Sequence, residues 1–459
     1  MSTPERDSPA APERHLGVLD AICIVVGIVI GSFIFFLGPF LVALNTTGPG
    51  TMLLAWVAGG FLCLCGALSY AELSTAYPKA GGEYSYISRA FGPEMSFLFV
   101  WARSTVIQTG SIAMLAYVFG KNMAQLAPIE ALGPSAPMAY ALLAIVALTA
   151  LNVLGWKTGK WTQNLLTGAK VLGVLAIIAV GLIVAPAAAP AAEPPDTSGA
   201  AFGLAMVFVL ITFGGWNEAA YVAGEVRNPK RNMIWVLLGS IAVLTGLYLT
   251  VNVAYLRTLG FAGLRGGPAV AATTLGRGVG EWGGTAITVL IAVSVLGAVN
   301  GCIFTGARAM YALGADYRAF SPLGRWNAQL GTPVIAIIVQ SAIAIILVLL
   351  PNLGEGFKKA FGDEAQAMVE YTAPVFWLFM MLVGLTVFIL RTWEPNVERP
   401  FRVPFFPVTV ILFILMCGYM VYSSLAYTKA GALVGVGVLL AGVPLYLLGG
   451  RRRTGAGAA

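Results

Sequence analysis

Hydrophobic residues along this chain are collected into long apolar runs that are separated by short polar segments. A helix needs about 20 predominantly apolar residues to cross the hydrocarbon core of a bilayer. The pattern predicts an all-α integral membrane protein with twelve transmembrane helices, at roughly 17–43, 51–75, 94–120, 137–155, 162–185, 201–224, 233–256, 284–310, 333–351, 367–391, 405–426 and 430–449.

The first run contains residues that interrupt a helix. Gly27, Gly31, Ser32, Gly38 and Pro39 lie within it, and glycine and proline weaken or end helices. An unwound backbone in hydrocarbon is tolerated mainly where it lines a cavity, because unpaired N–H and C=O groups are costly there. The N–H groups of the second half-helix would then bind an anion such as a carboxylate. Close helix packing is the alternative reason for these small residues.

The sixth run has a comparable interruption. Residues 211–218 read ITFGGWNE, which places paired glycines and polar side chains in mid-span. Interrupted helices at corresponding positions of two halves indicate a transport site near the bilayer midplane. Since each half has five helices, their topologies must be inverted. We therefore expect a 5+5 inverted repeat with helices 1 and 6 broken at the midplane.

A Pro/Ala-rich segment divides the two halves. The expected organisation is a cytoplasmic N-terminal tail at 1–16, a first five-helix repeat at 17–185, an extracytoplasmic linker at 186–200, a second five-helix repeat at 201–391, helices 11 and 12 at 392–449, and a cytoplasmic C-terminal tail at 450–459.

Charged residues are scarce and unevenly placed. Only 10% of the residues are charged, against about 25% in soluble domains. Lysine and arginine accumulate in the tails and the even-numbered loops, which predicts a multi-pass protein of the plasma (inner) membrane with both termini in the cytoplasm. The net charge of +7 therefore reports orientation and does not indicate a nucleic-acid partner.

Residues for catalysis or metal binding are missing from the pattern. The five cysteines lie within apolar runs, and His15 is the only histidine. An enzyme would need a nucleophile with its base or a metal cluster, so the sequence predicts no enzyme, metal site or cofactor. A channel would need a charge ring or a carbonyl filter motif, which is not seen. No cysteine falls in a predicted outer loop, so a disulfide-linked accessory subunit is not indicated.

Several motifs occur in a fixed order along the first eight predicted helices. They are GSFIF at 31–35, YPKAGGEY at 77–84, Asn152 with Gly155, FGGWN at 213–217, GEVRNPKRN at 224–232, and Ser294 to Asn300 followed by Arg308. Together they resemble the amino acid–polyamine–organocation superfamily, which has the LeuT fold, and most closely its L-type and alanine-serine-cysteine exchangers and their bacterial relatives. The last four helices match in hydropathy and in the RPFRVP loop at 399–404.

The resemblance implies a substrate site at the two breaks. The substrate's α-carboxylate would rest on backbone amides of the first break and its α-ammonium on carbonyls of both breaks, which suits the charges of half-helix ends. Phe33 replaces a family glycine beside the carboxylate position, and Ile211 would place an aliphatic cap where many of these exchangers carry an aromatic. The implied substrate-binding residues are Ile30, Gly31, Ser32, Phe33, Ile34, Ile211, Thr212, Phe213, Gly214 and Asn217.

Lys170 lies inside the fifth run, where a charge is costly and points to a function. It matches a family lysine that occupies the ion position of sodium-coupled relatives, and the resemblance implies a coupling or gating role with the Gly27 carbonyl and the Ser294 hydroxyl as partners. This disfavours sodium coupling and permits proton coupling. The alternative is a side chain that snorkels to the interface.

Other polar residues in or near the runs have alternative interpretations. For Arg103, snorkelling is favoured over a place in the cavity wall. Glu218 either faces a water-filled vestibule or pairs with another helix. Asn217 is expected to bond across helices 6 and 8, and Glu225 to pair with cytoplasmic arginines. Residues 74–93 fit a re-entrant or interfacial hairpin or an ordinary loop.

These observations predict a secondary transporter that moves neutral L-amino acids across the plasma membrane by alternating access, as a sodium-independent exchanger or a proton symporter. The expected partners are a small amino acid substrate and the lipid bilayer. A rival of the same fold carries a polyamine, a cationic amino acid or another organic cation. The lack of an evident acidic pair in helices 1, 6 and 8 argues against that rival, whereas a cavity-facing Glu218 would favour it.

Overall fold

The computed structural model describes residues 12–189, 197–350, 365–429 and 432–450. Most of the expected N-terminal tail, the middle of the Pro/Ala linker and nearly all of the C-terminal tail therefore lie outside the described residues. The described part is all-helical apart from two isolated β-bridges, Leu16 with Val226 and Asn327 with Thr332.

The first half of the chain forms a series of helices with short irregular turns between them. They are α1 (Val18–Val29), the 3₁₀ turn η1 (Phe33–Phe35), α2 (Leu37–Leu44), α3 (Pro49–Ala76), α4 (Glu83–Ala102), the π-helix η2 (Arg103–Ile107), α5 (Gln108–Leu126), the 3₁₀ turn η3 (Glu130–Ser135), α6 (Ala136–Val153), α7 (Trp156–Ala179) and the π-helix η4 (Val180–Val184).

The second half begins after the linker. It contains α8 (Phe202–Thr212), the 3₁₀ helix η5 (Trp216–Val222), α9 (Pro229–Leu264), α10 (Val270–Val279), α11 (Trp282–Asp316), α12 (Val334–Leu349), α14 (Ala365–Trp393), α15 (Val408–Thr428) and α16 (Ala432–Leu448). The short helix α10 was not among the expected elements.

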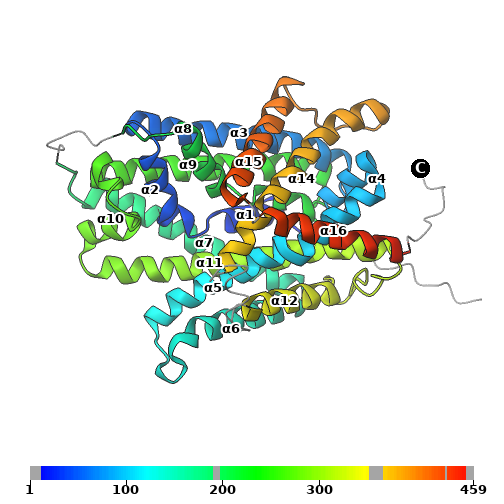
Figure 1. The fold of residues 1–459 in the computed structure, drawn as a ribbon, viewed down its shortest axis with the longest axis horizontal. Helices are drawn as coiled ribbons and strands as arrows, with labels where there is room; N and C mark the ends of the chain where they lie inside the picture. The colour runs from blue at the N-terminus through cyan, green and yellow to red at the C-terminus, as the bar shows by residue number, and fades with distance from the viewer. Residues whose placement is uncertain (1–11, 190–196, 351–364, 430–431, 451–459) are drawn as a thin grey trace, which may run out of the picture.

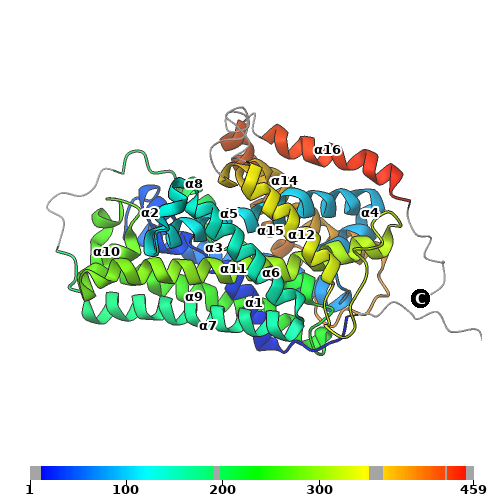
Figure 2. The ribbon, with the colours of Figure 1, turned by 90° about the horizontal axis from the view of Figure 1, so that it is seen from below.

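Each predicted apolar run coincides with a helix or with helical segments that follow one another. Within the described residues, eight helical stretches are long and apolar enough to cross a membrane, and three shorter apolar helices are α1, α12 and α16. The prediction of an all-helical membrane protein is confirmed. Figures 1 and 2 show most of the helices running along the longest axis of the molecule.

The two expected helix breaks are present in the structure. The first separates α1 from α2, and the second separates α8 from η5. α1 packs against η5, whereas α2 packs against α8, and Figure 1 shows α2 and α8 in the same half of the molecule. The first piece of each broken helix therefore lies beside the second piece of the other, so the two broken helices run antiparallel.

α1 lies at the centre of the bundle. It contacts α7, α9 and α11, and the side chains of Ile24, Val25 and Val29 are buried. Because α1 is enclosed by other helices rather than by lipid, its unwound end can be satisfied by polar groups of its neighbours.

Both ends of the described chain lie at the same end of the bundle. The Leu16 amide donates to the Glu225 carbonyl at 2.9 Å, and the Arg318 amide donates to the Gly450 carbonyl at 3.0 Å. The Arg308–Glu225 ion pair, at 2.8 Å, connects the two regions. We call this the basic end; it also holds segments 77–83, 224–228, 317–333 and 394–407.

The segment after α3 is helical rather than an ordinary loop. α4 begins at Glu83 and bends at Gly92, where φ is +88°. Tyr84, Tyr86 and Ile87 are buried. This agrees with the interpretation of the segment as a structured hairpin at the basic end.

Candidate functional site at two broken helices

The end of α1 is where the chain first leaves helical geometry. Val29 and Ile30 are buried, whereas Gly31, Ser32 and Phe33 are half-buried. In the described part of the chain, the amides of Ser32, Phe33 and Ile34 donate no hydrogen bond to another residue. These N–H groups precede α2, so the first break presents unpaired donors at the start of a half-helix.

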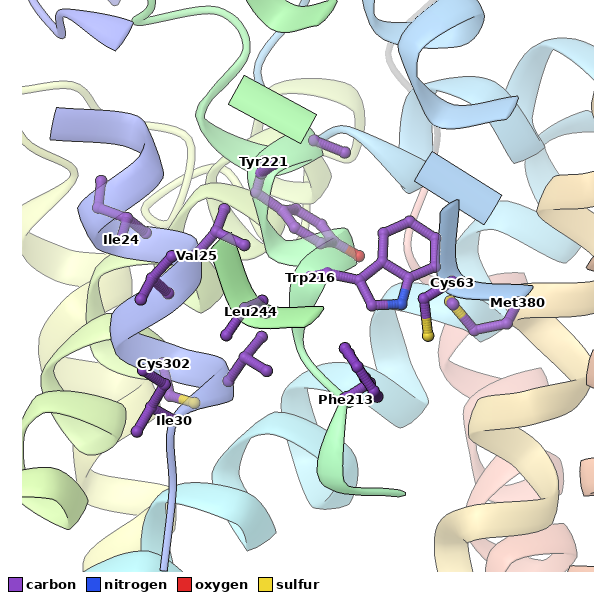
Figure 3. Packing of buried hydrophobic residues seen from close by; sticks show 14 of the residues in the cluster. Ile24, Val25, Ile30, Cys63, Phe213, Trp216, Tyr221, Leu244, Cys302 and Met380 are labelled. Atoms are coloured by element: carbon purple, nitrogen blue, oxygen red, sulfur yellow. The ribbon is translucent and has the colours of Figure 1, made fainter. Parts of the chain in front are cut away.

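The second break is enforced by backbone geometry at Gly215. Its φ of +106° is in the left-handed region, and a Cβ there would lie 2.7 Å from the Ile28 side chain of α1. Only glycine fits both constraints. Figure 3 shows Ile30 where α1 ends, beside the segment that carries Phe213 and Trp216. Glycine at this position therefore lets the two breaks approach closely.

Phe213 is the buried aromatic residue of the second break. Its ring lies 5.0 Å from that of Tyr248 and 6.3 Å from that of Trp56. The Ile211 side chain is instead 46% exposed, and its carbonyl accepts a hydrogen bond from the Gly214 amide at 3.0 Å. The Ile211 side chain therefore lies outside this buried aromatic cluster, and its role as an aliphatic cap stays a prediction.

Tyr248 connects the two breaks and was missed by sequence reasoning. Its hydroxyl lies 3.1 Å from the Val29 carbonyl oxygen and 3.3 Å from the Thr212 carbonyl oxygen. The Tyr248 hydroxyl thus contacts the last carbonyl of α1 and the last carbonyl of α8. Neither carbonyl has a hydrogen-bond partner within its own helix. A hydroxyl inside the long apolar run that forms α9 was the available signal.

Lys170 reaches the first break from α7 and is fully buried. Its ammonium donates to the carbonyls of Gly27, Ile30 and Ser294 at 2.5, 3.0 and 2.6 Å. The expected Gly27 contact is confirmed, and snorkelling is wrong. The expected Ser294 contact is made by the backbone carbonyl, because the Ser294 hydroxyl donates to the Ile30 carbonyl at 2.7 Å.

Glycine at position 27 is needed for this arrangement. A Cβ at Gly27 would lie 2.2 Å from both Gln163 and Thr167 of α7. Their side chains reach the Cys23 carbonyl, at 3.5 Å from Gln163 and 2.8 Å from Thr167. One polar face of α7 therefore satisfies carbonyls along the last turns of α1.

Glu83 is the centre of a buried polar cluster beneath the second break. It accepts hydrogen bonds from the Tyr70 hydroxyl at 2.6 Å, the Tyr221 hydroxyl at 2.5 Å and the Asn217 amide at 2.8 Å. The sequence predicts that the Asn217 side chain forms a hydrogen bond between the sixth and eighth apolar runs. That expectation is wrong, because Asn217 bonds to the start of α4, which the described fold brings beneath η5.

Arg103 and Glu218 form a second buried polar cluster. One guanidinium nitrogen of Arg103 lies 2.6 and 2.7 Å from the two carboxylate oxygens of Glu218. The Arg103 guanidinium also lies over the Tyr221 ring, 4.0 Å from its centre. The preferred snorkelling interpretation of Arg103 is wrong, because its side chain is only 2% exposed. Glu218 therefore pairs with a residue of another helix and does not face a water-filled vestibule.

Glu225 follows η5 at the basic end. Arg308 donates to both of its oxygens, at 2.8 and 3.0 Å, and His15 lies 3.5 Å away. Burial opposes ionisation of Glu225, but Arg308 and His15 outweigh it and lower the pKa of the carboxyl group. The expected pairing of Glu225 with an arginine is confirmed, and it fastens the segment after η5 to α11 and to the segment before α1.

Interrupted helices that meet inside a membrane bundle and present free backbone donors are characteristic of secondary transporters. The fold and the site therefore place this chain in that class of membrane protein.

Comparison with known proteins gives the family. A family model described as amino acid permease matches residues 16–447. The chain is 33% identical over 408 residues to the b(0,+)-type amino acid transporter 1 of Mus musculus, covering 87% of this chain and 81% of that protein. It is 30% identical to the cystine/glutamate transporter of Homo sapiens over 444 residues, covering 95% and 85%.

A bacterial relative is matched over nearly its whole length. The serine/threonine exchanger SteT of Bacillus subtilis (strain 168) is 29% identical over 441 residues, covering 95% of this chain and 96% of that protein. The chain belongs to the amino acid permease family of the amino acid–polyamine–organocation superfamily. It is a multi-pass membrane protein whose relatives transport amino acids and are not enzymes.

Proposed function

We propose that this protein moves neutral L-amino acids across the plasma membrane by alternating access, without sodium, as an exchanger or a proton symporter. The proposal includes the LeuT fold with twelve transmembrane helices and two inverted five-helix repeats. The antiparallel pairing of α1 with η5 and of α2 with α8 carries it, because an inverted repeat brings its first helices together in this way.

The substrate's carboxylate would bind at the start of η1. The amides of Ser32, Phe33 and Ile34 have no acceptor in the described part of the chain, and an anion at a half-helix N-terminus is favoured by the local dipole. The substrate's ammonium would lie near the carbonyls of Thr212 and Phe213, at the C-terminal end of α8. Gly31, with the remaining residues of the two breaks, would complete the site.

Lys170 supports the absence of sodium coupling. Its ammonium is held by three carbonyls between α1 and α11. A second cation at this position would be repelled by the lysine and would compete for the same oxygens. Release and recapture of a proton by Lys170 is the proposed route if transport is coupled to protons.

The preference for neutral substrates rests on how the buried acids are used. Glu218 is paired with Arg103, and Glu83 accepts three hydrogen bonds. Glu218 is therefore neutralised by Arg103, and the oxygens of the buried Glu83 already accept from Tyr70, Tyr221 and Asn217. This supports a neutral cargo over a polyamine or a cationic amino acid.

The proposed orientation places the basic end in the cytoplasm. Lysines and arginines gather at that end, as they do in the cytoplasmic loops of membrane proteins. The Glu225–Arg308 ion pair would then close the cytoplasmic side. We also propose the domain boundaries that the sequence predicts, with both tails on the cytoplasmic side.

Uptake into proteoliposomes of the purified protein tests the function. Radiolabelled alanine, leucine, arginine and putrescine are supplied separately, with and without internal amino acid and with and without an inward proton gradient. Uptake of alanine or leucine that requires internal amino acid would establish exchange, and stimulation by the gradient in empty vesicles would establish symport. Uptake of only arginine or putrescine would overturn the proposed substrate class.

A further inference from the structure

Three arginines line a small cavity at the basic end of the protein. Its lining residues are Arg391, Pro395, Arg399 and Arg402, and its volume is about 230 Å³. This is smaller than the roughly 300–1,000 Å³ of pockets that enclose whole small molecules. The cavity therefore suits one charged group of a larger ligand better than a complete metabolite. We call it the arginine pocket.

Glu72 of α3 contacts two of the arginines that line the arginine pocket. Its carboxylate accepts from two nitrogens of Arg391 at 2.8 and 2.5 Å and from the Val403 amide at 2.7 Å. The Arg399 guanidinium lies 3.6 Å away. The buried Glu72 carboxylate thus pairs with Arg391 and lies near Arg399, while the lining itself consists of three arginines and a proline, so positive charge predominates there.

The three arginines differ in how many of their donors are already used. Arg399 donates to the carbonyls of Leu390, Glu394 and Val397, which fixes it at the end of α14. In the described residues, Arg402 makes no hydrogen bond or ion pair, and the outer Nη1 of Arg391 is also uncommitted. Guanidinium groups with open donors are suited to bind a phosphate oxyanion.

Three exposed apolar residues lie close in the chain to the arginines of the pocket. Trp393 is 69% exposed, Phe405 86% and Val408 58%. In the chain, Trp393 lies between the lining residues Arg391 and Pro395 at the end of α14, and Phe405 and Val408 follow Arg402 at the start of α15. Aromatic and aliphatic side chains at such a position lie at the interface between headgroups and acyl chains.

We propose that the arginine pocket binds the phosphate group of an anionic phospholipid. The phosphate enters between Arg391 and Arg402, and the acyl chains lie over the exposed apolar residues beside it. The excess positive charge favours a lipid with net negative charge over a zwitterionic one. Its lining includes none of the residues of the two helix breaks, and the site does not depend on which amino acid is transported.

Native mass spectrometry of the purified full-length protein tests this proposal. The protein is titrated separately with phosphatidylglycerol, phosphatidylcholine and the soluble ester glycerol 1-phosphate. Arg402→Gln is the test variant, since Arg402 is exposed and has no protein partner within the described chain. Lys230→Gln is the matched control, because it removes one positive charge from the same end, where Lys230 is 56% exposed and paired with Glu398.

The expected result is preferential binding of phosphatidylglycerol by the wild-type protein. Arg402→Gln should weaken that binding about fivefold, from about 1 kcal/mol per basic residue at an anionic surface, whereas Lys230→Gln should not change it. Unchanged phosphatidylglycerol binding by Arg402→Gln, or an equal loss in Lys230→Gln, would overturn the proposal. Displacement of the lipid by equimolar glycerol 1-phosphate would show a site for soluble phosphate instead.

Discussion

Arg103 and Glu218 form an ion pair inside the helix bundle, with N–O distances of 2.6 and 2.7 Å. The two residues come from different halves of the chain, Arg103 from the π-helix η2 and Glu218 from the 3₁₀ helix η5. Neither element is a regular α-helix. The ion pair therefore joins the second piece of one broken helix to a π-helical segment between α4 and α5 in the first half.

Removing one partner of this pair should be strongly destabilising. Arg103→Gln leaves the Glu218 carboxylate buried without its cation, which costs roughly 3–5 kcal/mol in buried pairs. The double variant Arg103→Gln with Glu218→Gln should recover most of this loss, because no charge is then left unpaired. Thermal unfolding in detergent measures both effects.

The matched control for this experiment is the exposed pair Arg89 with Glu394, where Arg89 is 36% exposed. Arg89→Gln should change the free energy of unfolding by less than about 1 kcal/mol. An equal loss of unfolding free energy in Arg103→Gln and Arg89→Gln would show that the buried pair contributes no more to stability than the exposed pair.

Gly215→Ala should disturb the second break. The left-handed conformation and the 2.7 Å approach to Ile28 both penalise a Cβ, at about 1–3 kcal/mol each. Gly168→Ala is the control, because a Cβ on this glycine of α7 meets nothing within 4 Å. We expect uptake to fall at least tenfold in the first variant and to be retained in the second, at equal amounts of reconstituted protein.

Tyr248→Phe should impair the connection between the two breaks with little effect on folding. The ring contacts with Trp56 and Phe213 stay, whereas the hydroxyl shared by the Val29 and Thr212 carbonyls is lost. A hydrogen bond of this kind contributes about 1 kcal/mol, so the half-saturation concentration for uptake should rise roughly fivefold. Unchanged uptake kinetics would mean that this hydroxyl does not support the site.

Lys170→Met should abolish transport. It removes the ammonium that three carbonyls of α1 and α11 share, and leaves those carbonyls buried without a donor. Ser294→Ala is a milder variant, since it removes only the hydroxyl that donates to Ile30. We expect uptake to be lost in Lys170→Met and lowered several-fold in Ser294→Ala; full activity of Lys170→Met would refute the coupling role.

The contacts of Glu394 at the basic end should depend on pH. Burial opposes its ionisation, but hydrogen bonds from Arg89 and Tyr77 outweigh burial and hold the pKa of Glu394 below its usual value of 4.5. A lowered pKa in the folded state means that the stabilisation is present above pH 4.5 and is lost as the pH falls through the folded-state value.

The comparison of wild type with Glu394→Gln measures this contribution. The wild-type protein should have the higher melting temperature at neutral pH, and the two melting temperatures should converge as the solution is acidified below pH 4.5. A difference that stays constant over that range would exclude an ionised Glu394 as its origin.

The sequence by itself determined the helices and where two of them break. Runs of about 20 apolar residues specify membrane helices locally, and the left-handed φ of +106° at Gly215 interrupts the sixth run at its paired glycines. The Lys170 contact with α1 was also predictable, through the family motif. Each of these features depends on nearby residues or on a motif with fixed spacing.

Only the tertiary structure decided which polar groups meet. Arg103 and Glu218 are 115 positions apart, and Asn217 and Glu83 are 134 apart. Periodicity places a side chain on a helix face but does not say which distant helix lies opposite. For an isolated arginine near a helix end, the sequence favours a side chain that extends to the membrane interface. The packing of η5 against the first half supplied the carboxylate that makes burial of Arg103 possible.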